Sequence, residues 1–366
     1  MTEKRLIKIF EQLASGDRLK IYDYNLLKQD LSESQNRLRP LDLKDLKSLE
    51  PEEIKEIIEQ RSQLLHLAYS EILQTLVIHN IQLDASSLFS LLWYCWLPLA
   101  QRLAQQQQKI GRTFIQGLLG GQGTGKTTLG IVLNILLSHL GKTFLSISLD
   151  DLYKTYTERQ KLRDRCPALI WRGPPSTHNI DLGIQVLQQL RDRPLGKPQE
   201  IVVPKFDKSL HNGAGDRTEP EISYSADIIL FEGWFVGMRP LPISEFKNLI
   251  PPIVSESDRD FALECNANLN SYLPLWEYLD SLIVLIPEDY NYSMQWRLEA
   301  EHKLIATGKS GMSDQEIIQF VEYFWKALHP KLFLPHMIGN QASDRAYVDL
   351  VIEISRSHLP TRIYRP

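Results

Sequence analysis

The fold is decided by the stretch Gly120-Gly121-Gln122-Gly123-Thr124-Gly125-Lys126-Thr127. It follows the pattern G-x-x-x-x-G-K-T, which is typical of a phosphate-binding loop (P-loop). Glycines let the backbone bend sharply and come close to an anion, so that several N–H groups form a nest for phosphate oxygens. A helix that begins directly after the loop adds the positive end of its dipole. The pattern therefore predicts a nucleotide site at the start of a helix.

The residues on both sides of the loop supply the context that the motif requires. Residues 113–119 read as a buried strand, and Gly141 is a stop signal for the helix that follows the loop. Between them, apolar residues recur on one helical stripe: Leu129, Val132, Leu133, Leu136, Leu137 and Leu140. The alternative is a glycine-rich turn in an unrelated α/β protein. The order of strand, loop and helix favours the P-loop.

Each residue type of a P-loop has its own task. We expect Lys126 to reach the β- and γ-phosphates of ATP, and the Thr127 hydroxyl to ligate Mg²⁺. The residues expected to bind ATP are Gly120, Gly121, Gln122, Gly123, Thr124, Gly125, Lys126, Thr127 and Thr128.

Composition limits the class of protein. The chain has 366 residues and a net charge of −4, which gives no general attraction to nucleic acid or acidic membranes. Its three cysteines are too widely spaced for a metal motif or a disulfide framework, which favours a reducing compartment. The first residues have no apolar signal core, and the most apolar run, residues 88–100, is too short to span a bilayer. We expect a cytoplasmic protein with neither a membrane nor a nucleic-acid partner.

The chain divides into two predicted regions. Residues 1–90 are charged and helix-prone, and Pro51 followed by acidic residues is typical of a helix start. We predict an accessory helical region there. Residues 91–366 are predicted to form the P-loop domain, an α/β fold with a mostly parallel sheet flanked by helices.

Two further strands end in acidic residues. Residues 143–149 form the second predicted strand, and Asp150-Asp151 follows it. Ligands of open α/β sheets bind outside the carboxyl ends of the strands, so Asp150 is a candidate to deprotonate or orient an attacking hydroxyl. The alternative is that both acids cap the next helix; we favour catalysis for Asp150 and capping or metal support for Asp151. The third strand, residues 227–234, resembles a Walker B element, and Glu232 is the candidate that supports Mg²⁺.

Polar loops supply candidate substrate contacts. Residues 154–180 are predicted to be a loop, in which Arg172 and His178 are candidates to hold an anionic substrate. Residues 201–207 are predicted to form a short strand, and the region around it contributes Lys205, Asp207 and Arg217. A solvated basic surface and ordinary polar turns are the competing interpretations of these residues.

The C-terminal third is predicted to be irregular from residue 241 to 275 and regular after it. A strand is expected at 281–286, a helix at 290–306 and a final strand at 347–354, while Asp181 is expected to cap an earlier helix. Arg297 is a candidate lid arginine that neutralises the transferring phosphoryl group. An i,i+4 pair with Glu301 is equally compatible with the spacing.

These separated motifs together resemble the D-glycerate 3-kinase family of plants, fungi and cyanobacteria, which is related to uridine and pantothenate kinases. The resemblance covers residues 96–366 and is carried best by Phe231-Glu232-Gly233-Trp234, Trp296-Arg297-Leu298 and Gly311-Met312-Ser313-Asp314. It implies transfer of the ATP γ-phosphate to the 3-hydroxyl of D-glycerate, with Mg²⁺, in photorespiratory recovery of carbon. Arg172 and His178 keep the spacing seen in plant members, although the residues between them differ.

Two other functions remain open at this point. One is another small-molecule P-loop kinase of the uridine or pantothenate type, for which an aromatic cage around the acceptor would be expected. The other is a nucleotide-regulated binding protein without turnover. The sequence determines neither the oligomeric state nor the role of residues 1–90, the adenine contacts or any regulator.

Overall fold

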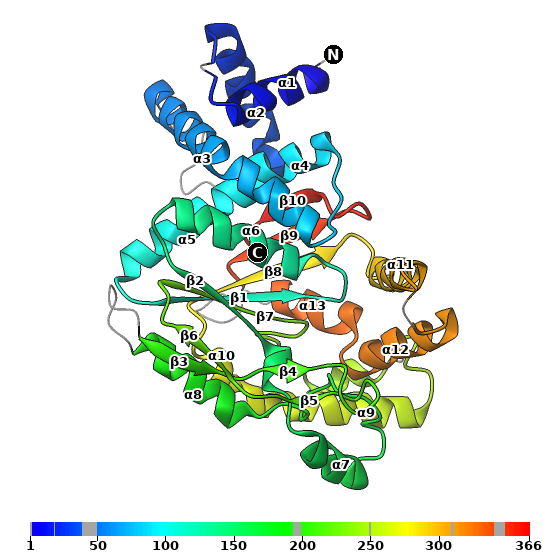
Figure 1. Ribbon diagram of the computed structural model, residues 1–366. Helices are drawn as coiled ribbons and strands as arrows, with labels where there is room; N and C mark the ends of the chain where they lie inside the picture. The colour runs from blue at the N-terminus through cyan, green and yellow to red at the C-terminus, as the bar shows by residue number, and fades with distance from the viewer. Residues whose placement is uncertain are drawn as a thin grey trace.

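The computed structural model describes residues 2–17, 19–38, 50–192, 199–248, 250–308, 311–339 and 348–366. Its centre is a six-stranded sheet with the order β10-β9-β8-β1-β7-β2 (Figure 1). The strands are β1 (Phe114–Gly120), β2 (Phe144–Ser148), β7 (Ile228–Gly233), β8 (Ser281–Pro287), β9 (Leu350–Ile354) and β10 (Pro360–Tyr364). Only β10 pairs antiparallel with its neighbour in this sheet, so the prediction of a mostly parallel sheet is confirmed.

The alternation of side chains along the strands produces two hydrophobic cores. In β7, Ile228 and Leu230 face one core, whereas Ile229 and Phe231 face the other. Successive residues of a strand point to opposite faces, so a run that is apolar throughout must be covered on both faces. Helices cover each face in Figure 1.

The first face of the sheet is covered by the N-terminal helices and the P-loop helix. These are α1 (Thr2–Ala14), α2 (Ile21–Leu38), α3 (Pro51–Ile78), α4 (Ala85–Leu91), α5 (Leu97–Ile110) and α6 (Lys126–His139). α3 begins at the predicted proline, with a capping box at Glu50, and it packs against α6. One continuous core runs from α1 to the sheet. The helical region before residue 90 is therefore confirmed, whereas its boundary as a separate domain stays a prediction.

The predicted buried helix at 88–100 is also confirmed. α4, a π-helical turn at Leu92–Trp96 and α5 form one run across this segment, and most of its side chains are buried. No helix among the described residues is both long and apolar enough to cross a membrane. Cys95, Cys166 and Cys265 are buried and free of disulfide bonds.

The second face is covered by helices from the later part of the chain. They are α8 (Ile180–Arg191), α9 (Glu256–Asn268), α10 (Leu273–Trp276), α12 (Asp314–Ala327) and α13 (Pro330–Gly339), while α11 (Tyr292–Ala306) follows β8. The prediction of irregular structure at 241–275 was wrong, because α9 lies there. Ser255 caps it with a capping box, and Phe261, Ala262 and Cys265 form its buried face.

Three smaller predictions also need correction. The loop predicted at 154–180 contains α7 (Tyr156–Arg165), a surface helix that Thr155 caps. The cap of α8 is Asn179, whose side chain accepts from the Leu182 N–H, and Asp181 lies in the first turn instead. The strand predicted at 347–354 corresponds to β9, which begins at Leu350, and residue 347 lies outside the described residues. It is not the final strand, because β10 follows it.

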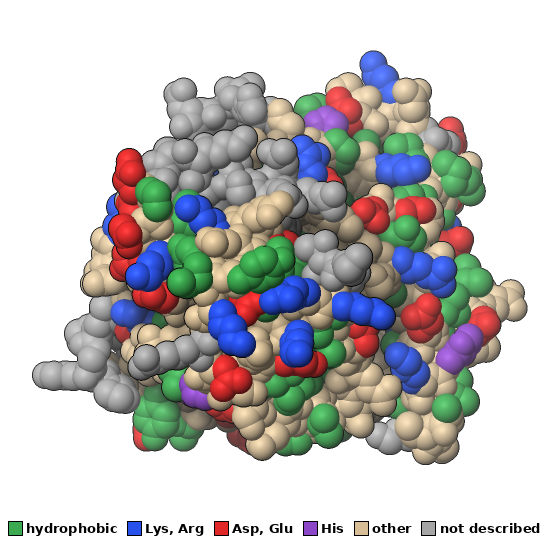
Figure 2. Space-filling view, turned by 90° about the horizontal axis from the view of Figure 1, so that it is seen from above, with side chains coloured by type: hydrophobic (Ala, Val, Ile, Leu, Met, Phe, Trp, Pro, Cys, Tyr) green, Lys and Arg blue, Asp and Glu red, His purple; other side chains and the backbone are tan. Residues whose placement is uncertain are grey.

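Two hairpin-like pairs stand apart from the main sheet. β3 (Glu200–Val203) pairs with β6 (Glu221–Tyr224), and β4 (Phe206–Asp207) pairs with β5 (Asp216–Arg217). The strand predicted at 201–207 is thus split at Pro204 into two pieces that join different pairs. On the face of the molecule seen in Figure 2, basic and acidic side chains lie interspersed.

Candidate active site

The P-loop lies where β1 ends and α6 begins. Gly125 caps α6 in a left-handed backbone conformation, and Gly123 has a φ of +77°. A Cβ on Gly123 would lie 2.7 Å from the Cβ of Trp296, which is on α11. Glycine is thus required at Gly123 both by the backbone conformation and by the close approach of a helix. The backbone arrangement fits the cradle for phosphate that the motif predicts.

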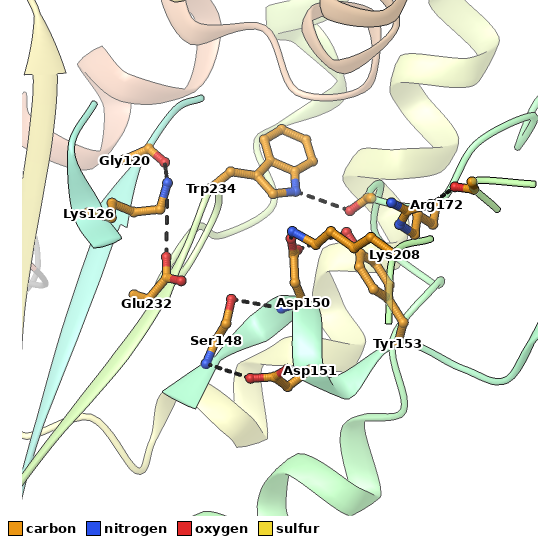
Figure 3. Close-up of polar contacts among 12 residues, drawn as sticks. Gly120, Lys126, Ser148, Asp150, Asp151, Tyr153, Arg172, Lys208, Glu232 and Trp234 are labelled. Atoms are coloured by element: carbon orange, nitrogen blue, oxygen red, sulfur yellow. Dashed lines mark hydrogen bonds and ion pairs between the residues drawn. The ribbon is translucent and has the colours of Figure 1, made fainter. Parts of the chain in front are cut away.

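Lys126 folds back onto its own loop. Its ammonium donates to the carbonyl oxygens of Gly120 at 2.8 Å and Gly121 at 3.2 Å, and it lies 4.0 Å from the Glu232 carboxylate. Burial lowers the pKa of Lys126 and raises the pKa of Glu232, and the attraction between the two groups opposes both shifts. Figure 3 shows this chain of contacts from Gly120 to Glu232. A phosphate oxygen would give the ammonium a stronger acceptor than a carbonyl.

Glu232 occupies the position expected for a residue that supports Mg²⁺. It lies near the carboxyl end of β7, and its register partner on β2 is Ser148. Thr127 is the second residue of α6. Among the described residues, no group of three or more His, Cys, Asp and Glu side chains gathers as a metal site. Mg²⁺ in kinases is held by one or two protein ligands plus phosphate oxygens and water, so Thr127 and Glu232 fit this ion.

Asp150 lies in a short 3₁₀ turn, Leu149–Leu152, directly after β2. Its carboxylate accepts hydrogen bonds from the Lys208 ammonium at 2.6 Å and the Tyr153 hydroxyl at 2.8 Å (Figure 3). Burial acts to raise the pKa of Asp150, but the charge and hydrogen bonds of its partners outweigh burial and hold the pKa below its ordinary value. Asp150 is therefore ionised and able to accept a proton.

The neighbouring Asp151 has a structural task. Its carboxylate accepts the N–H of Ser148 at 3.4 Å, and the Ser148 side chain accepts the N–H of Asp150 in return. This is a capping box at the end of β2. Of the two acids, Asp151 therefore acts as a capping residue, as the alternative interpretation predicted, whereas the carboxylate of Asp150 does not.

His178 is buried and neutral. Its Nδ1 lies 2.7 Å from the Tyr272 hydroxyl, and burial lowers its pKa to about 3. The Tyr272 oxygen also accepts the N–H of Ser176, so we assign the Tyr272 hydrogen to Nδ1. The proton of neutral His178 then sits on Nε2, which has no hydrogen-bond partner. Because Nε2 is buried in this structure, contact between His178 and an anionic substrate stays a prediction.

The two candidate arginines surround Tyr153. Arg172 donates to the Gly213 carbonyl at 2.6 Å, and its guanidinium lies over the rings of Phe206 and Tyr153. The Nε of Arg217 donates to the Tyr153 carbonyl at 2.8 Å, whereas its Nη2 is buried without a partner. Both arginines thus contact Tyr153, whose hydroxyl donates to the candidate base Asp150.

The other two candidates from this region make contacts within their own loop. Lys205 pairs with Glu221 at 3.1 Å. Asp207 accepts the backbone N–H of Ser209 at 2.8 Å and its hydroxyl at 2.6 Å. Their contact with substrate stays a prediction; in this structure Lys205 pairs with the first residue of β6, and Asp207 shapes the turn between β4 and β5.

Arg297 forms the i,i+4 pair that its spacing allows. Its guanidinium lies 2.7 Å from the buried Glu301 carboxylate, which also accepts the N–H of Met312. Of the two interpretations, the ion pair is observed here, and a lid role for Arg297 stays a prediction.

Three side chains of the site were not selected from the sequence. Lys208 holds Asp150, Tyr272 sets the tautomer of His178, and the Trp234 indole donates to the Gly173 carbonyl at 3.2 Å. Trp234 stands in a motif that carries the family resemblance, and Lys208 directly follows the strand predicted at 201–207. No spacing shows that Lys208 reaches a carboxylate 58 positions away.

An apolar pocket adjoins the P-loop. Its cavity volume is about 80 Å³. Gly121 and Gln122 line one side, and four aromatic side chains line the rest together with aliphatic residues: Trp234, Tyr290, Phe324 and Trp325.

Comparison with known proteins identifies the family. A scan against protein-family models found no match. The chain is 33% identical over 254 residues to the chloroplastic D-glycerate 3-kinase of Arabidopsis thaliana, covering 67% of this chain and 53% of that protein. It is 33% identical over 230 residues to the uncharacterized kinase mug58 of Schizosaccharomyces pombe, covering 61% and 82%. It is 31% identical over 257 residues to the probable ATP-dependent kinase TDA10 of Saccharomyces cerevisiae, covering 66% and 86%.

The chain belongs to the family of P-loop kinases that includes D-glycerate 3-kinase. Its match spans about half the length of the Arabidopsis relative, 53%, and most of the two yeast relatives, 82% and 86%. Among solved structures, a D-glycerate 3-kinase from Cryptococcus neoformans superposes with a TM-score of 0.62 at 24% identity, covering 74% of this chain and 99% of that one. That likeness confirms the fold of the family for this chain.

Proposed function

We propose that the protein transfers the γ-phosphate of Mg·ATP to the 3-hydroxyl of D-glycerate, giving 3-phosphoglycerate and ADP. The observation that carries this proposal is the ionised Asp150 at the same sheet edge as Lys126 and Glu232. Ser148 and Glu232 are register partners on β2 and β7, and β7 pairs with β1, which leads into the P-loop. A base and a phosphate cradle are thus held by adjacent elements. The Arabidopsis relative supports D-glycerate as the acceptor.

The residues of the site have distinct tasks in this reaction. Lys126 leaves the carbonyls of Gly120 and Gly121 for the β- and γ-phosphates, where its charge offsets the charge that develops in transfer. Thr127 and Glu232 would hold Mg²⁺, which neutralises phosphate charge when bound. The glycerate oxygen forms a bond to the γ-phosphorus as the bond from that phosphorus to the bridging oxygen of ADP breaks. Asp150 takes the hydroxyl proton.

The carboxylate of glycerate needs a partner near Asp150. Arg172 and Arg217 lie around Tyr153, and the free Nη2 of Arg217 and the Nε2–H of His178 are donors without protein partners. An arginine matches a carboxylate with two parallel hydrogen bonds. These three residues form the proposed acceptor site. The photorespiratory role, the cytoplasmic location and the absence of nucleic-acid and membrane partners belong to the same proposal.

One observation favours a second candidate. The pocket beside Gly121 and Gln122 is lined mostly by aromatic and aliphatic side chains, which is more apolar than glycerate requires. It would suit a kinase whose acceptor carries an apolar part, such as a uridine or pantothenate type of enzyme.

A coupled ADP-release assay separates these candidates. The acceptors are D-glycerate, glycerol, uridine and pantothenate, and the Lys126→Ala variant is the control for transfer at the P-loop. We expect turnover of D-glycerate and poor turnover of glycerol, since a site with polar groups left unpaired discriminates by about 10⁴-fold or more. Efficient turnover of uridine or pantothenate without glycerate would overturn the acceptor assignment. Tight ATP binding without ADP release from any acceptor would favour the binding protein.

A further inference from the structure

We propose that Lys208 is a positioning residue for the catalytic base: its ammonium holds the Asp150 carboxylate in place, ionised and facing the P-loop. This inference rests on the proposed function, because it takes Asp150 as the base. Lys208 lies between β4 and β5, outside the main sheet, and its Nζ approaches Asp150 Oδ2 to 2.6 Å (Figure 3).

The loop around Lys208 is built to present this side chain. Asp207, directly before it, accepts both the N–H and the hydroxyl of Ser209, directly after it. Such a turn fixes the backbone on both sides of Lys208. The hairpin is further tied to the region by Arg159, which donates to the carbonyls of Ala214 at 2.7 Å and Gly215 at 2.5 Å. The Lys208 side chain is 59% exposed, and its ammonium contacts Asp150.

The other groups near Asp150 do not supply the same charge. They are Tyr153 and Asp151 from its own turn, His178 from the segment before α8, Lys126 from α6 and Glu232 from β7. Tyr153 donates a neutral hydrogen bond, and His178 is uncharged. Lys126 is directed to the Gly120 and Gly121 carbonyls. Asp151 and Glu232 disfavour the ionised form of Asp150 when they are ionised. Lys208 brings a positive charge into direct contact with Asp150.

The positive charge of Lys208 becomes more important when ATP is bound. When ATP binds, Lys126 is engaged by phosphate, and the phosphates add negative charge near Asp150. Without Lys208, the burial of Asp150 and these negative charges would both favour the protonated carboxyl group. A protonated Asp150 could no longer accept the hydroxyl proton. Lys208 keeps the base available at pH values where it would otherwise be blocked.

The test measures kcat/KM for D-glycerate against pH in the full chain for Lys208→Met, Lys208→Arg and the control Lys161→Met, which removes an exposed lysine of α7. Loss of Lys208 raises the pKa of Asp150, so the acid limb of the Lys208→Met profile should move up by about one to three pH units. The loss of rate in Lys208→Met should therefore be greatest at low pH and smallest on the plateau above that limb. Lys208→Arg and Lys161→Met should keep the wild-type limb.

Other results would overturn the inference. An acid limb that does not move in Lys208→Met shows that Lys208 leaves the base unaffected. A rate that is equally depressed at every pH, and not restored in Lys208→Arg, shows a role in folding of the hairpin instead.

A second measurement does not depend on the acceptor. Asp150 is titrated by NMR in protein carrying ¹³C-carboxyl aspartate, with its resonance assigned through Asp150→Asn. A raised midpoint in Lys208→Met supports the inference even if glycerate proves inactive, in which case only the proposed function fails. An unchanged midpoint overturns the inference even if glycerate is phosphorylated.

Discussion

A carboxylate that is largely buried is costly to keep ionised, and Asp150 is kept so by two donors from different parts of the chain. Lys208 and Tyr153 contact its two oxygens, one each. Burial alone would leave a neutral acid that cannot act as a base. At the scale of single residues, the chemistry of this site therefore depends on which partner each carboxylate has. The carboxylate of Asp151, the next residue, accepts a hydrogen bond from the backbone N–H of Ser148.

The first prediction follows from that difference. Asp150→Asn keeps the shape of the side chain but cannot take a proton, so kcat should fall by about 10²- to 10⁴-fold with little change in ATP affinity. Steady-state kinetics and ATP titration measure the two quantities. Asp151→Asn is the matched control and should mainly lower the melting temperature, since Asp151 completes a capping box. A much smaller loss in Asp150→Asn would direct the search for the base to Asp151 or Asp207.

At the scale of elements, the P-loop and α11 constrain each other. Gly123 needs its left-handed backbone and leaves no room for a Cβ against Trp296. Trp296 is in turn fixed by its indole N–H, which donates to the Arg356 carbonyl at 2.8 Å beyond β9. A side chain added to the P-loop at this position would therefore disturb the packing of α11, a helix from a distant part of the chain.

We predict that Gly123→Ala weakens ATP binding through this contact. A left-handed alanine costs about 1–2 kcal/mol, and the added methyl group must also displace Trp296 or the loop. The matched control is Gly141→Ala, which has a similar φ of +70° after the same helix α6 but nothing within 4 Å of its Cβ. Both variants should lose stability, whereas only Gly123→Ala should raise the Kd for ATP in isothermal titration. Equal ATP affinity in the two variants would contradict a role for the contact.

At the scale of the whole molecule, the N-terminal helices and the sheet share a core. The cluster that contains Ile9 and Phe10 of α1 also contains Leu118 and Ile228 of the sheet. Glu71 of α3 pairs with His139 of α6 at 3.1 Å, next to the buried Ile72. A shared core couples the unfolding of the parts that form it.

We therefore predict a single cooperative transition that depends on α3. Ile72→Ala should lower the free energy of unfolding by about 2–5 kcal/mol, whereas Val77→Ala, at an exposed position of the same helix, should change it little. Denaturation followed by both far-UV circular dichroism and tryptophan fluorescence measures this. If Ile72→Ala produced an early transition that left the rest of the unfolding curve unchanged, residues 1–90 would be a separate domain.

Elements with local signals could be predicted from the amino-acid sequence. The P-loop, the helix after it, the parallel strands and the buried helix at 88–100 follow from periodicity, glycine positions and apolar runs, and the structure has all of them. The helix α9 was missed because its buried face is a few residues among charged ones. The strand β10 was missed because it pairs only as an edge strand with β9.

The partners of the charged residues, in contrast, depend on the folded arrangement of the chain. Arg297 had two partners compatible with its spacing, and packing brought Glu301 to it. His178 became neutral because folding buried it against Tyr272, 94 positions away. Lys208 reached Asp150 because the turn at Asp207 and the end of β2 fold to the same place. Charge states depend on burial and on neighbours that are distant in the chain, and neither quantity is encoded in local spacing.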